Sequence, residues 1–557
     1  MEPAKYLTHY RPVVMTDDPD KVVTLDFETF YDTKDGYSLK KMSIEAYVRD
    51  PRFRVFGLGV KRGSNQTHWI EGPANVERFF RKVPLNQYLC IAQNAPFEGL
   101  IMSHHYDVRP AAWLDTQAMC AMAYGNTVTS VSLDAMTKRF LPGHVKDQTD
   151  LFALDGVKNP TPDQLARLGV YCQGDCDKTY LLFAKFLPLL QQSPANLDLI
   201  NLIACMFTDP VLELDAPVLD QLIANEMVEK QAALDKSPAT DMQQLTSNAK
   251  LATLLKSLGV EPPMKLSPSD PNKETYAFAK SDRAFIDLQL HEDQRVRDLV
   301  AARLRCKTTI NETRAKNYKA VAERGTWPVH LHTSGARTTH RLSGGSGGGG
   351  NPQNLGKKSP LREAIVPPTG FDLFAIDSSN IELRTAMTLA NERDVVKQLA
   401  DPGFDLYSVF ASVIYDVPVH EIVPSQRMVG KVGCLQLQYG SGAVTFRDMA
   451  WGWGVLLEPD EAARVTALYR ASFPKVRRIW NIFDRILTML LRKEEEETWF
   501  DHLVKPVVEG PEGAPSLYLP EQGLYLTYPN LRRSFSEERG RWEVLYDGFD
   551  KKTYRRY

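Results

Sequence analysis

The chain is poor in cysteine, and its cysteines show no pairing pattern. Its 557 residues include seven cysteines, with no Cys-x-x-Cys pair and no even number that would suit a disulfide framework. Free thiols of this kind are typical of a reducing, cytosolic environment. We therefore expect an intracellular protein without disulfides.

The sequence also lacks a long apolar run. No stretch approaches the ~20 residues that a membrane-spanning helix needs. The N-terminal Met-Glu-Pro-Ala-Lys-Tyr has no charged-then-apolar signal pattern. We expect a cytoplasmic protein with no membrane partner.

The sequence also has no large excess of positive or negative charge. The 67 basic and 69 acidic residues give a net charge of -2. A large enzyme can confine its basic surface to one groove, so this balance does not exclude a nucleic-acid partner. The length predicts roughly three or four domains.

Two carboxylates mark the first segment of interest. Residues 21–28 are rich in β-branched and apolar side chains, which predicts a buried strand. Side chains repeat every two residues along a strand, so Asp26 and Glu28 share one face. Two such carboxylates are costly unless a cation neutralises them, and Mg2+ or Mn2+ suits their oxygen ligands.

Two further pieces follow in order. One is Asn94-Ala95-Pro96-Phe97-Glu98, and the other is Tyr171-x3-Asp175, which a helix would place on one face. Together with Asp26 and Glu28 they resemble the three motifs of DnaQ-like (DEDD) 3′-5′ exonucleases of the YxxxD variety. Alone, a DxE is usually a solvated strand end, and YxxxD occurs in many helices.

The resemblance implies a role for each residue of this set. Asp26, Glu28 and Asp175 would bind metal, and Tyr171 would orient the attacking water. Asn94 and Phe97 would shape the pocket that binds the DNA terminus. The family usually has aspartate where this chain has Glu98. Glu98 would therefore ligate metal after a small backbone shift or act in the outer sphere.

Two motifs of another kind lie in the second half. An apolar run, Phe374 to Ile376, ends in Asp377, and Glu382 follows. Pro424-Ser425 predicts a helix start with Ser425 as N-cap. In that helix Arg427 and Lys431 lie one turn apart, ~6 Å along the axis, a spacing that suits two phosphates of a triphosphate.

These segments, with Leu435, Tyr439 and Gly440, resemble motifs A and B of family A (DNA polymerase I-like) DNA polymerases. The resemblance makes Asp377 a catalytic metal ligand and Glu382 the residue that monitors the sugar 2′ position. Arg427 and the catalytic Lys431 would bind the incoming deoxynucleoside triphosphate (dNTP), with Tyr439 against its base. Leu435 stands where the family usually has Phe or Tyr. Otherwise, Arg427 and Lys431 would be a solvated helix face, Asp377 a strand-terminal residue and Glu382 a helix-start residue.

A glycine run precedes motif A. On composition alone, residues 344–350 are a flexible linker. Beside the polymerase motifs, the segment resembles the family's Arg-Leu-Ser … Gln-Asn-Leu, which implies that Arg341, Gln353 and Asn354 bind primer-template DNA. The glycines would then let the backbone approach a phosphate.

The region before it, residues 193–330, has helical periodicity and a group of basic residues. These are either a solvated helix face or a thumb-like grip on duplex phosphates. They are Arg303, Arg305, Lys307, Arg314, Lys316 and Lys319.

We thus expect an α/β exonuclease domain of the RNase H-like type, joined to an α+β right-hand fold with thumb, fingers and incomplete palm. The expected segments are an N-terminal extension (1–20), the exonuclease (21–192), the thumb-like region (193–330), the first palm part (331–390), the fingers (391–505) and the remaining palm strands (506–557).

The sequence contains no His-Asp-Glu of motif C, which carries the family's second metal-binding carboxylate. Two Mg2+ (or Mn2+) per active site need carboxylates from two places. The expectation is therefore the N-terminal subunit of a split bacteriophage DNA polymerase, working in the host cytoplasm, with motif C on a second polypeptide. Three alternatives stay open: a self-sufficient exonuclease whose polymerase half only binds DNA, a binding module without chemistry, or a shortened form of a single-chain polymerase.

Overall fold

A computed structural model describes most of the chain, in two compact units. The described residues are 12–15, 18–144, 154–267, 270–280, 282–307, 310–345, 347–356, 359–494, 504–537, 540–550 and 555–556. The first unit comprises residues 1–373, 521–527 and 549–557, and the second comprises 374–520 and 528–548. Much of the predicted N-terminal extension, residues 1–11, 16 and 17, lies outside the described residues. No described helix is both long and apolar enough to span a membrane.

A five-stranded mixed sheet organises the first part of the first unit. Its order is β3-β2-β1-β4-β5. β1 is antiparallel to β2 and parallel to β4, which is parallel to β5. The strands are β1 Val22–Thr29, β2 Val55–Arg62, β3 His68–Glu71, β4 Leu89–Ala92 and β5 Ala112–Asp115.

The central strand β1 confirms the strand predicted over 21–28. Leu25 and Phe27 point into the core at 1% and 5% exposure, whereas Asp26 and Glu28 are half-buried on the other face. This alternation is the period of two that a strand imposes. The two carboxylates therefore leave the sheet from the same side.

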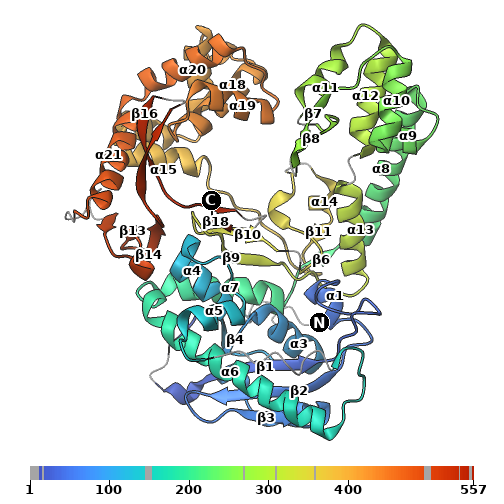
Figure 1. Ribbon diagram of the computed structural model, residues 1–557, viewed down its shortest axis with the longest axis vertical. Helices are drawn as coiled ribbons and strands as arrows, with labels where there is room; N and C mark the ends of the chain where they lie inside the picture. Colours follow the sequence, from blue (N-terminus) through green and yellow to red (C-terminus); the bar gives the residue numbers. More distant parts are fainter. Residues whose placement is uncertain are drawn as a thin grey trace. The chain divides into compact units, whose positions relative to one another are not determined.

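The helix α6, Pro162–Leu190, packs along β1 and β2 (Figure 1). A reciprocal capping box starts it: the Thr161 hydroxyl accepts from the Gln164 N–H, and the Gln164 side chain accepts from the Thr161 N–H. The helix predicted around Tyr171 and Asp175 is confirmed. The other helices around the sheet are α1 Ile44–Val48, α2 Pro73–Lys82, α3 Ala95–Tyr106, α4 Thr116–Tyr124, α5 Leu133–Phe140 and α7 Pro194–Thr208.

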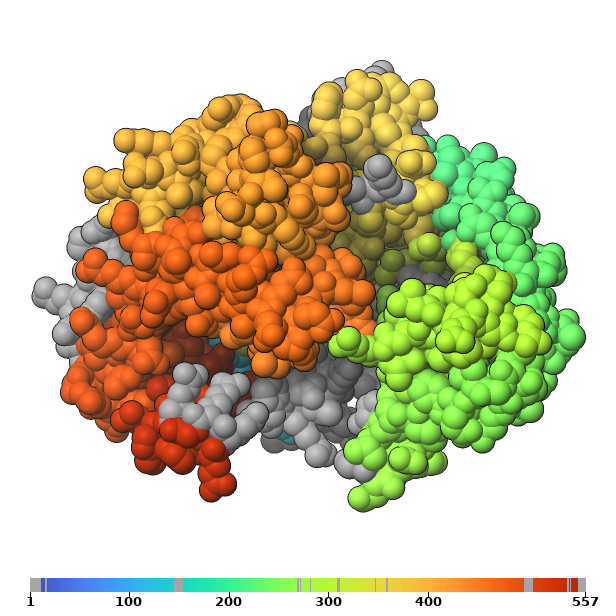
Figure 2. All heavy atoms as spheres, turned by 90° about the horizontal axis from the view of Figure 1, so that it is seen from above, coloured from blue at the N-terminus to red at the C-terminus, as the bar shows by residue number. Residues whose placement is uncertain are grey.

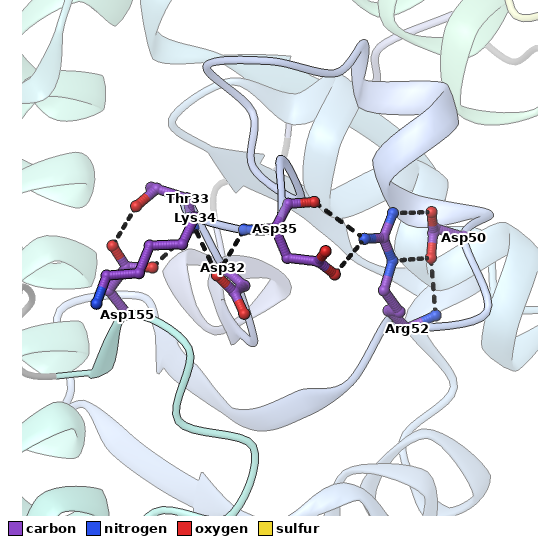
Figure 3. A network of polar contacts seen from close by, with 7 residues as sticks. All are labelled: Asp32, Thr33, Lys34, Asp35, Asp50, Arg52 and Asp155. Atoms are coloured by element: carbon purple, nitrogen blue, oxygen red, sulfur yellow. Dashed lines mark hydrogen bonds and ion pairs between the residues drawn. The ribbon is translucent and has the colours of Figure 1, made fainter.

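The loop after β1 is fixed by a polar network (Figure 3). The Arg52 guanidinium donates to both Asp50 oxygens at 2.8 Å and to Asp35 Oδ2 at 2.9 Å. Asp155 accepts from the backbone N–H of Thr33 at 2.8 Å and from its hydroxyl. This network holds the segment that leaves the carboxylate-bearing strand.

A buried ion-pair node joins helix α1 to residues near 324. Glu45 is 0% exposed, and its two oxygens accept from Arg324 Nε and Nη2 at 2.8 and 2.7 Å. Arg49 Nη1 lies 3.3 Å from Glu45 Oε1 and donates to the Thr326 carbonyl at 2.8 Å. Such a buried charge persists only because it is fully paired.

Residues 216–322 form a mostly helical part of the first unit, drawn in green (Figure 1). α12 and α13 pack on α8 over a core that includes Leu251, Phe285 and Leu299. An antiparallel hairpin of Met264–Ser267 and Asp270–Tyr276 interrupts the helices. The helices are α8 Ala216–Lys236, α9 Met242–Thr246, α10 Asn248–Ser257, α11 Arg283–Asp287, α12 Gln294–Lys307 and α13 Ile310–Ala322.

The six basic residues of this part all have protein partners. Arg303 is 3% exposed and donates to the Leu245 carbonyl. Arg305 pairs with Glu226 and Glu229, Lys316 with Glu312 and Lys319 with Asp220, while Lys307 and Arg314 donate to backbone carbonyls. These contacts favour the structural interpretation over the phosphate grip.

The glycine run before motif A packs against protein. Gly345 N–H donates to the His330 carbonyl, and Gly347 N–H donates to His330 Nδ1 at 2.8 Å. A Cβ on Gly348 would overlap the Pro328 carbonyl oxygen. The described glycines of this run are therefore neither a linker nor free to approach a phosphate, because their missing side chains make room for a neighbouring segment.

Short strands surround this run in the first unit. β9 Leu331–Ala336 pairs with β10 Arg341–Gly344, and β6 Glu213–Leu214 pairs with β11 Ile365–Val366. β14 Leu524–Thr527 falls within the segment 506–557, where palm strands are expected, and its Tyr525 carbonyl lies 2.9 Å from His340 Nε2.

The second unit is mainly helical, and its helices form a continuous orange body (Figure 2). Its core joins Phe410, Val432, Val465 and Tyr469. A Cβ on Gly430 would overlap the Tyr407 carbonyl oxygen, so the two helices that carry them pack closely. The helices are α15 Ile381–Leu389, α16 Arg393–Leu399, α17 Leu406–Tyr415, α18 Pro424–Leu437, α19 Ala443–Gly452, α20 Pro459–Ser472 and α21 Pro474–Leu491.

Four strands accompany these helices. β12 Lys505–Val507 pairs with β13 Ser516–Leu519, and β15 Arg532–Ser536 pairs with β16 Arg541–Leu545, both antiparallel. These strands lie within residues 506–557 or directly before them, where the sequence predicts strands.

One local prediction is wrong. α18 begins at Pro424 with Val423 as its N-cap residue, so Ser425 lies in the first turn. Pro424 takes the first helical position, where its missing N–H costs nothing. The Gln426 side chain, at the third helical position, accepts from the Val423 N–H at 3.1 Å.

Candidate functional site

The carboxylates of the first unit converge around β1. Asp26 and Glu28 leave the strand toward α6, where Tyr171 and Asp175 lie one turn apart. Tyr171 hydrogen-bonds Asp175. Burial, the charge of Asp175 and this hydrogen bond raise the pKa of Tyr171 well above its ordinary value, with Glu28 and Asp26 adding to the effect. The phenol is therefore a hydrogen-bond donor at every physiological pH.

Glu98 lies on α3 and faces the same cluster. It is 3% exposed, and burial raises its pKa well above the ordinary value, with further contributions from the charges of Asp26, Asp115 and Glu28. Its Oε2 atom is buried without a hydrogen-bond partner among the described residues. An orphaned carboxylate oxygen beside two carboxylates is the situation that a bound cation relieves.

The donor atoms of these residues suit a divalent metal ion, although among the described residues no three of the carboxylates bring their oxygens within 4.8 Å of one another. Asp26, Glu28, Glu98 and Asp175 offer oxygen ligands only, which is what Mg2+ and Mn2+ prefer. The longer side chain of Glu98 lies inside the cluster, where the family resemblance implied an aspartate.

Asn94 and Phe97 stand beside this cluster. Asn94 adopts the left-handed conformation, φ 81°, just before α3, and its N–H donates to Asp115 Oδ1 at 3.1 Å. Asp115 also accepts from the Gln117 N–H as the N-cap of α4. Burial raises the pKa of Asp115 to about 6, although backbone hydrogen bonds oppose that rise. Phe97 packs against Tyr47 with 6.0 Å between ring centroids.

Three residues in this cluster were missed by the sequence interpretation. Lys178 Nζ lies 3.2 Å from Asp175 Oδ1 with only 8% of the residue exposed. The Cys172 thiol lies 3.3 Å from Asp26 Oδ2, and Cys176 is one turn further along α6. The signal was present, because a Cys-x3-Cys in a helix places both thiols on the face that carries Asp175.

The second unit holds the predicted nucleotide-binding residues on α18. Arg427 Nε donates to Asp405 Oδ2 at 2.6 Å, and its Nη2 donates to Oδ1 at 3.2 Å. Asp405 is the N-cap of α17 and also accepts from the Ser408 hydroxyl at 2.5 Å. Its pKa is lowered, because hydrogen bonds from Arg427 and Ser408 outweigh its burial. The guanidinium is thus held by a carboxylate, the same kind of oxygen anion that a phosphate would present.

The other residues predicted to bind the nucleotide lie further along α18 or directly after it. Lys431 Nζ lies 5.5 Å from the centroid of the Trp453 ring. The Tyr439 hydroxyl donates to Glu382 Oε2 at 3.1 Å. Leu435 is half-buried between them in sequence, and Tyr439 is 66% exposed. The structure therefore brings Glu382 and Tyr439 together, as a pocket for a sugar and a base requires.

Motif A is exposed. Residues 371–378 have no regular secondary structure, and Phe374 and Ile376 are 79% and 94% exposed. Asp377 is exposed as well, whereas Glu382 lies in the first turn of α15. The apolar run predicted to deliver Asp377 therefore ends in an open segment.

The predicted DNA-binding residues Arg341, Gln353 and Asn354 belong to the first unit, and all three are exposed. Gln353 Nε2 donates to the Leu342 carbonyl at 3.2 Å, and the Asn354 carbonyl accepts from Arg314 at 3.3 Å. Their side chains are placed on a surface, as contact with a nucleic acid would need.

Known structures give the class of fold. The chain is similar to the structure of the POL domain of Pol1 from M. smegmatis in complex with DNA primer-template and dNTP. The TM-score is 0.57 at 17% identity, over 86% of this chain and 76% of that one. The fold is that of a polymerase domain.

Sequence comparison gives the family. The model of DNA polymerase family A matches residues 219–503, more than half of the chain, so the chain belongs to DNA polymerase family A. It is 24% identical to DNA polymerase I of Synechocystis sp. over 376 residues, 64% of this chain and 36% of that protein. It is 26% identical to DNA polymerase I of Pseudomonas aeruginosa over 377 residues, 63% and 38% of the two chains. The chain thus spans less than two fifths of the length of these curated relatives.

Proposed function

We propose that this chain carries two sites for DNA synthesis and its correction. One is a 3′-5′ exonuclease site, and the other is the dNTP-binding face of a family A DNA polymerase. The first part rests on the electrostatic interactions that Tyr171 and Glu98 have with Asp26 and Glu28. Together with Asp175, these residues come from three different elements, β1, α3 and α6. The mixed sheet with β1 at its centre supports an RNase H-like exonuclease domain over residues 21–192.

In the exonuclease reaction, water attacks the last phosphodiester of a DNA 3′ end. The water oxygen bonds to phosphorus, its proton leaves to solvent, and the 3′ oxygen of the penultimate nucleotide departs and takes up a proton. Divalent metal ions, when bound, activate that water and neutralise charge on the phosphate. Asp26, Glu28 and Asp175 would hold them, and Glu98 is the fourth carboxylate within reach.

Tyr171 positions the attacking water. Its hydroxyl donates to Asp175, which fixes the ring and leaves the phenol oxygen as an acceptor for a water proton. The raised pKa keeps that hydroxyl protonated, so the hydrogen bond to Asp175 persists throughout the reaction. Asn94 and Phe97 flank the cluster on the side where a terminal nucleotide would lie.

In the polymerase half, Arg427 and Lys431 would bind the triphosphate of a dNTP. Glu382 and Tyr439, already joined by a hydrogen bond, would contact its sugar and base. Asp377 would contribute one metal-binding carboxylate. That a second carboxylate comes from another polypeptide, as in a split bacteriophage polymerase, stays a prediction.

The exposed motif A favours a second candidate for the chain on its own, namely an exonuclease whose polymerase half only binds DNA. Glu98 and Asp175 are buried and Asp26 and Glu28 are half-buried, whereas Asp377 lies exposed on an open segment. The two candidates differ in one observable, which is primer extension.

The test uses the full chain, Mg2+, dNTPs and a 3′-recessed labelled primer-template. Shortening of the primer that Asp26→Asn abolishes would support the exonuclease. Extension that Asp377→Asn abolishes would support a complete polymerase. Shortening without extension would support the second candidate, or a polymerase site that needs a further polypeptide, and adding a family A fragment with motif C separates these two. A primer left unchanged in length by the wild-type chain would overturn the proposal.

A further inference from the structure

Two thiols lie against a predicted magnesium ligand. One carboxylate oxygen of Asp26 and the sulfurs of Cys172 and Cys176 all lie within 4.8 Å of one another. The Cys172 sulfur is 3.3 Å from Asp26 Oδ2. Within the part of the chain that the structure describes, no other group of three His, Cys, Asp or Glu side chains brings its ligand atoms so close.

The chemistry of these atoms differs from that of the neighbouring carboxylates. Sulfur ligands select soft or borderline cations such as Zn2+ and Cd2+, and disfavour Mg2+. With Zn–S and Zn–O bonds of ~2.3 and ~2.1 Å, neighbouring ligands on a tetrahedron are about 3.5 Å apart. The spacing of Asp26, Cys172 and Cys176 therefore suits one such ion after side-chain adjustments of less than about 1 Å.

The surroundings hold both sulfurs in place. Cys172 and Cys176 are 0% exposed and lie one turn apart on α6. A Cβ on Gly59 of β2 would lie 2.7 Å from each sulfur, so the bare backbone of that strand packs against the pair. Asp26 is half-buried, so it is the one of the three side chains that solvent reaches.

We propose that Asp26, Cys172 and Cys176 form a site for a thiophilic divalent cation, Zn2+ or Cd2+, which shares Asp26 with the magnesium centre. Each ligating thiol gives its proton to solvent, so two thiolates and a carboxylate surround the ion. The ion takes Asp26 away from Mg2+ and thereby stops 3′-5′ hydrolysis. This consequence rests on the proposed exonuclease, whereas cation binding does not.

The binding test is a Cd2+ titration of the full chain in excess Mg2+, followed by the ultraviolet sulfur-to-cadmium charge-transfer band. We expect one Cd2+ per chain with this band. The double variant Cys172→Ser/Cys176→Ser removes it, and Cys120→Ser keeps it as the matched control, because Cys120 is also a fully buried helical thiol of the first unit. A band that survives in the double variant would overturn the site.

The activity test adds Zn2+ to the exonuclease assay in Mg2+. The double variant should need at least about tenfold more Zn2+ for half-inhibition, because loss of ligand-shell partners costs that much in metal affinity. Equal inhibition of the variant and the wild type would overturn the shared-ligand role. A thiolate band in a chain that hydrolyses no DNA would leave the site standing and defeat the proposed exonuclease instead.

Circular dichroism verifies the fold of each variant. Should the double variant not fold, Asp26→Asn is the second probe. It keeps both sulfurs and replaces the charged carboxylate with a neutral amide, a much weaker ligand, so the band should persist with a Cd2+ affinity lowered by about tenfold or more. Unchanged affinity in that variant would remove Asp26 from the site.

Discussion

The carboxylate cluster around β1 and the basic stripe on α18 represent two ways of building a reaction site. In the first, Glu98 and Asp175 are 3% and 5% exposed and their neighbours already hydrogen-bond one another. In the second, Arg427 and Tyr439 are exposed and Asp377 lies on an open segment. The side chains of the first group are ordered by folding, whereas those of the second lie in contact with solvent.

Burial explains the difference. A buried charge must be paired or neutralised when the core forms, so the carboxylates of the first unit are organised by the same contacts that fold the sheet and α6. A solvated guanidinium or ammonium needs no such order, and a surface salt bridge is worth little. Arg427 is nevertheless paired with Asp405, and this ion pair orders its guanidinium in the absence of a triphosphate.

The largest expected effect tests the proposed exonuclease site around β1. Asp26→Asn should reduce the rate of 3′-terminal hydrolysis by about 100- to 1000-fold, because it removes a metal ligand at the reacting phosphate. Single-turnover cleavage of a labelled single strand measures this. The same variant should bind dNTPs with unchanged affinity, and a loss of dNTP binding would show that the two sites are not independent.

The next effect tests the open site. Arg427→Ala should weaken dNTP binding by about 10- to 150-fold, since a hydrogen bond to a charged group contributes about 1.5–3 kcal/mol. Equilibrium binding of a fluorescent dNTP measures the dissociation constant. Asp405→Asn is the matched variant, because it frees the guanidinium without removing it. If the alanine variant binds as tightly as the wild type, α18 is a solvated face.

A pair of glycines sharpens the contrast between a packed and an open surface. Gly348→Ala should lower the free energy of unfolding by about 1–3 kcal/mol, because its Cβ would overlap the Pro328 carbonyl. Gly452→Ala, at the end of α19 with nothing within 4 Å of its Cβ, should change it by less than about 1 kcal/mol, in the stabilising direction. Chemical denaturation followed by circular dichroism measures both. Equal effects would contradict the packing role of the glycine run.

The smallest effect concerns pH. The pKa of Asp115 is raised to about 6 in the folded chain from an ordinary value near 3.8, so the folded state binds the proton more tightly than the unfolded state. Stability from this group is therefore greatest below about pH 4 and falls as pH rises toward 6, with little change above that. Asp115→Asn should flatten this slope, which is at most about 1.4 kcal/mol per pH unit. Thermal unfolding of both proteins between pH 4 and 7 measures it, and identical slopes would contradict the assignment.

Periodicity in the sequence predicted the elements that carry the sites. The period of two in 21–28 placed Asp26 and Glu28 on one side of β1, and the four-residue spacings placed Tyr171 with Asp175 and Arg427 with Lys431. These are local regularities, and local sequence encodes them.

Contacts between distant segments could not be predicted in the same way. The thiols of Cys172 and Cys176 meet Asp26 only because α6 packs on β1. The glycine run meets His330 because β10 runs antiparallel to β9 and returns the chain to that residue. Of the basic residues from 303 to 319, Arg305 and Lys319 pair with acidic residues of α8, some 70 to 100 positions earlier in the chain. Only the folded chain brings these groups together, so a charge run or a glycine run alone is a poor guide to a binding surface.

The ion-pair node of Glu45, Arg49 and Arg324 bears on how the proposed exonuclease should be inactivated. Deleting residues 21–192 would remove the carboxylate that Arg324 binds and strip the Thr326 carbonyl of its donor. The remaining protein would expose groups that are buried or paired in the full chain. A point substitution at Asp26 leaves these buried contacts intact. It is therefore the better way to inactivate the proposed exonuclease.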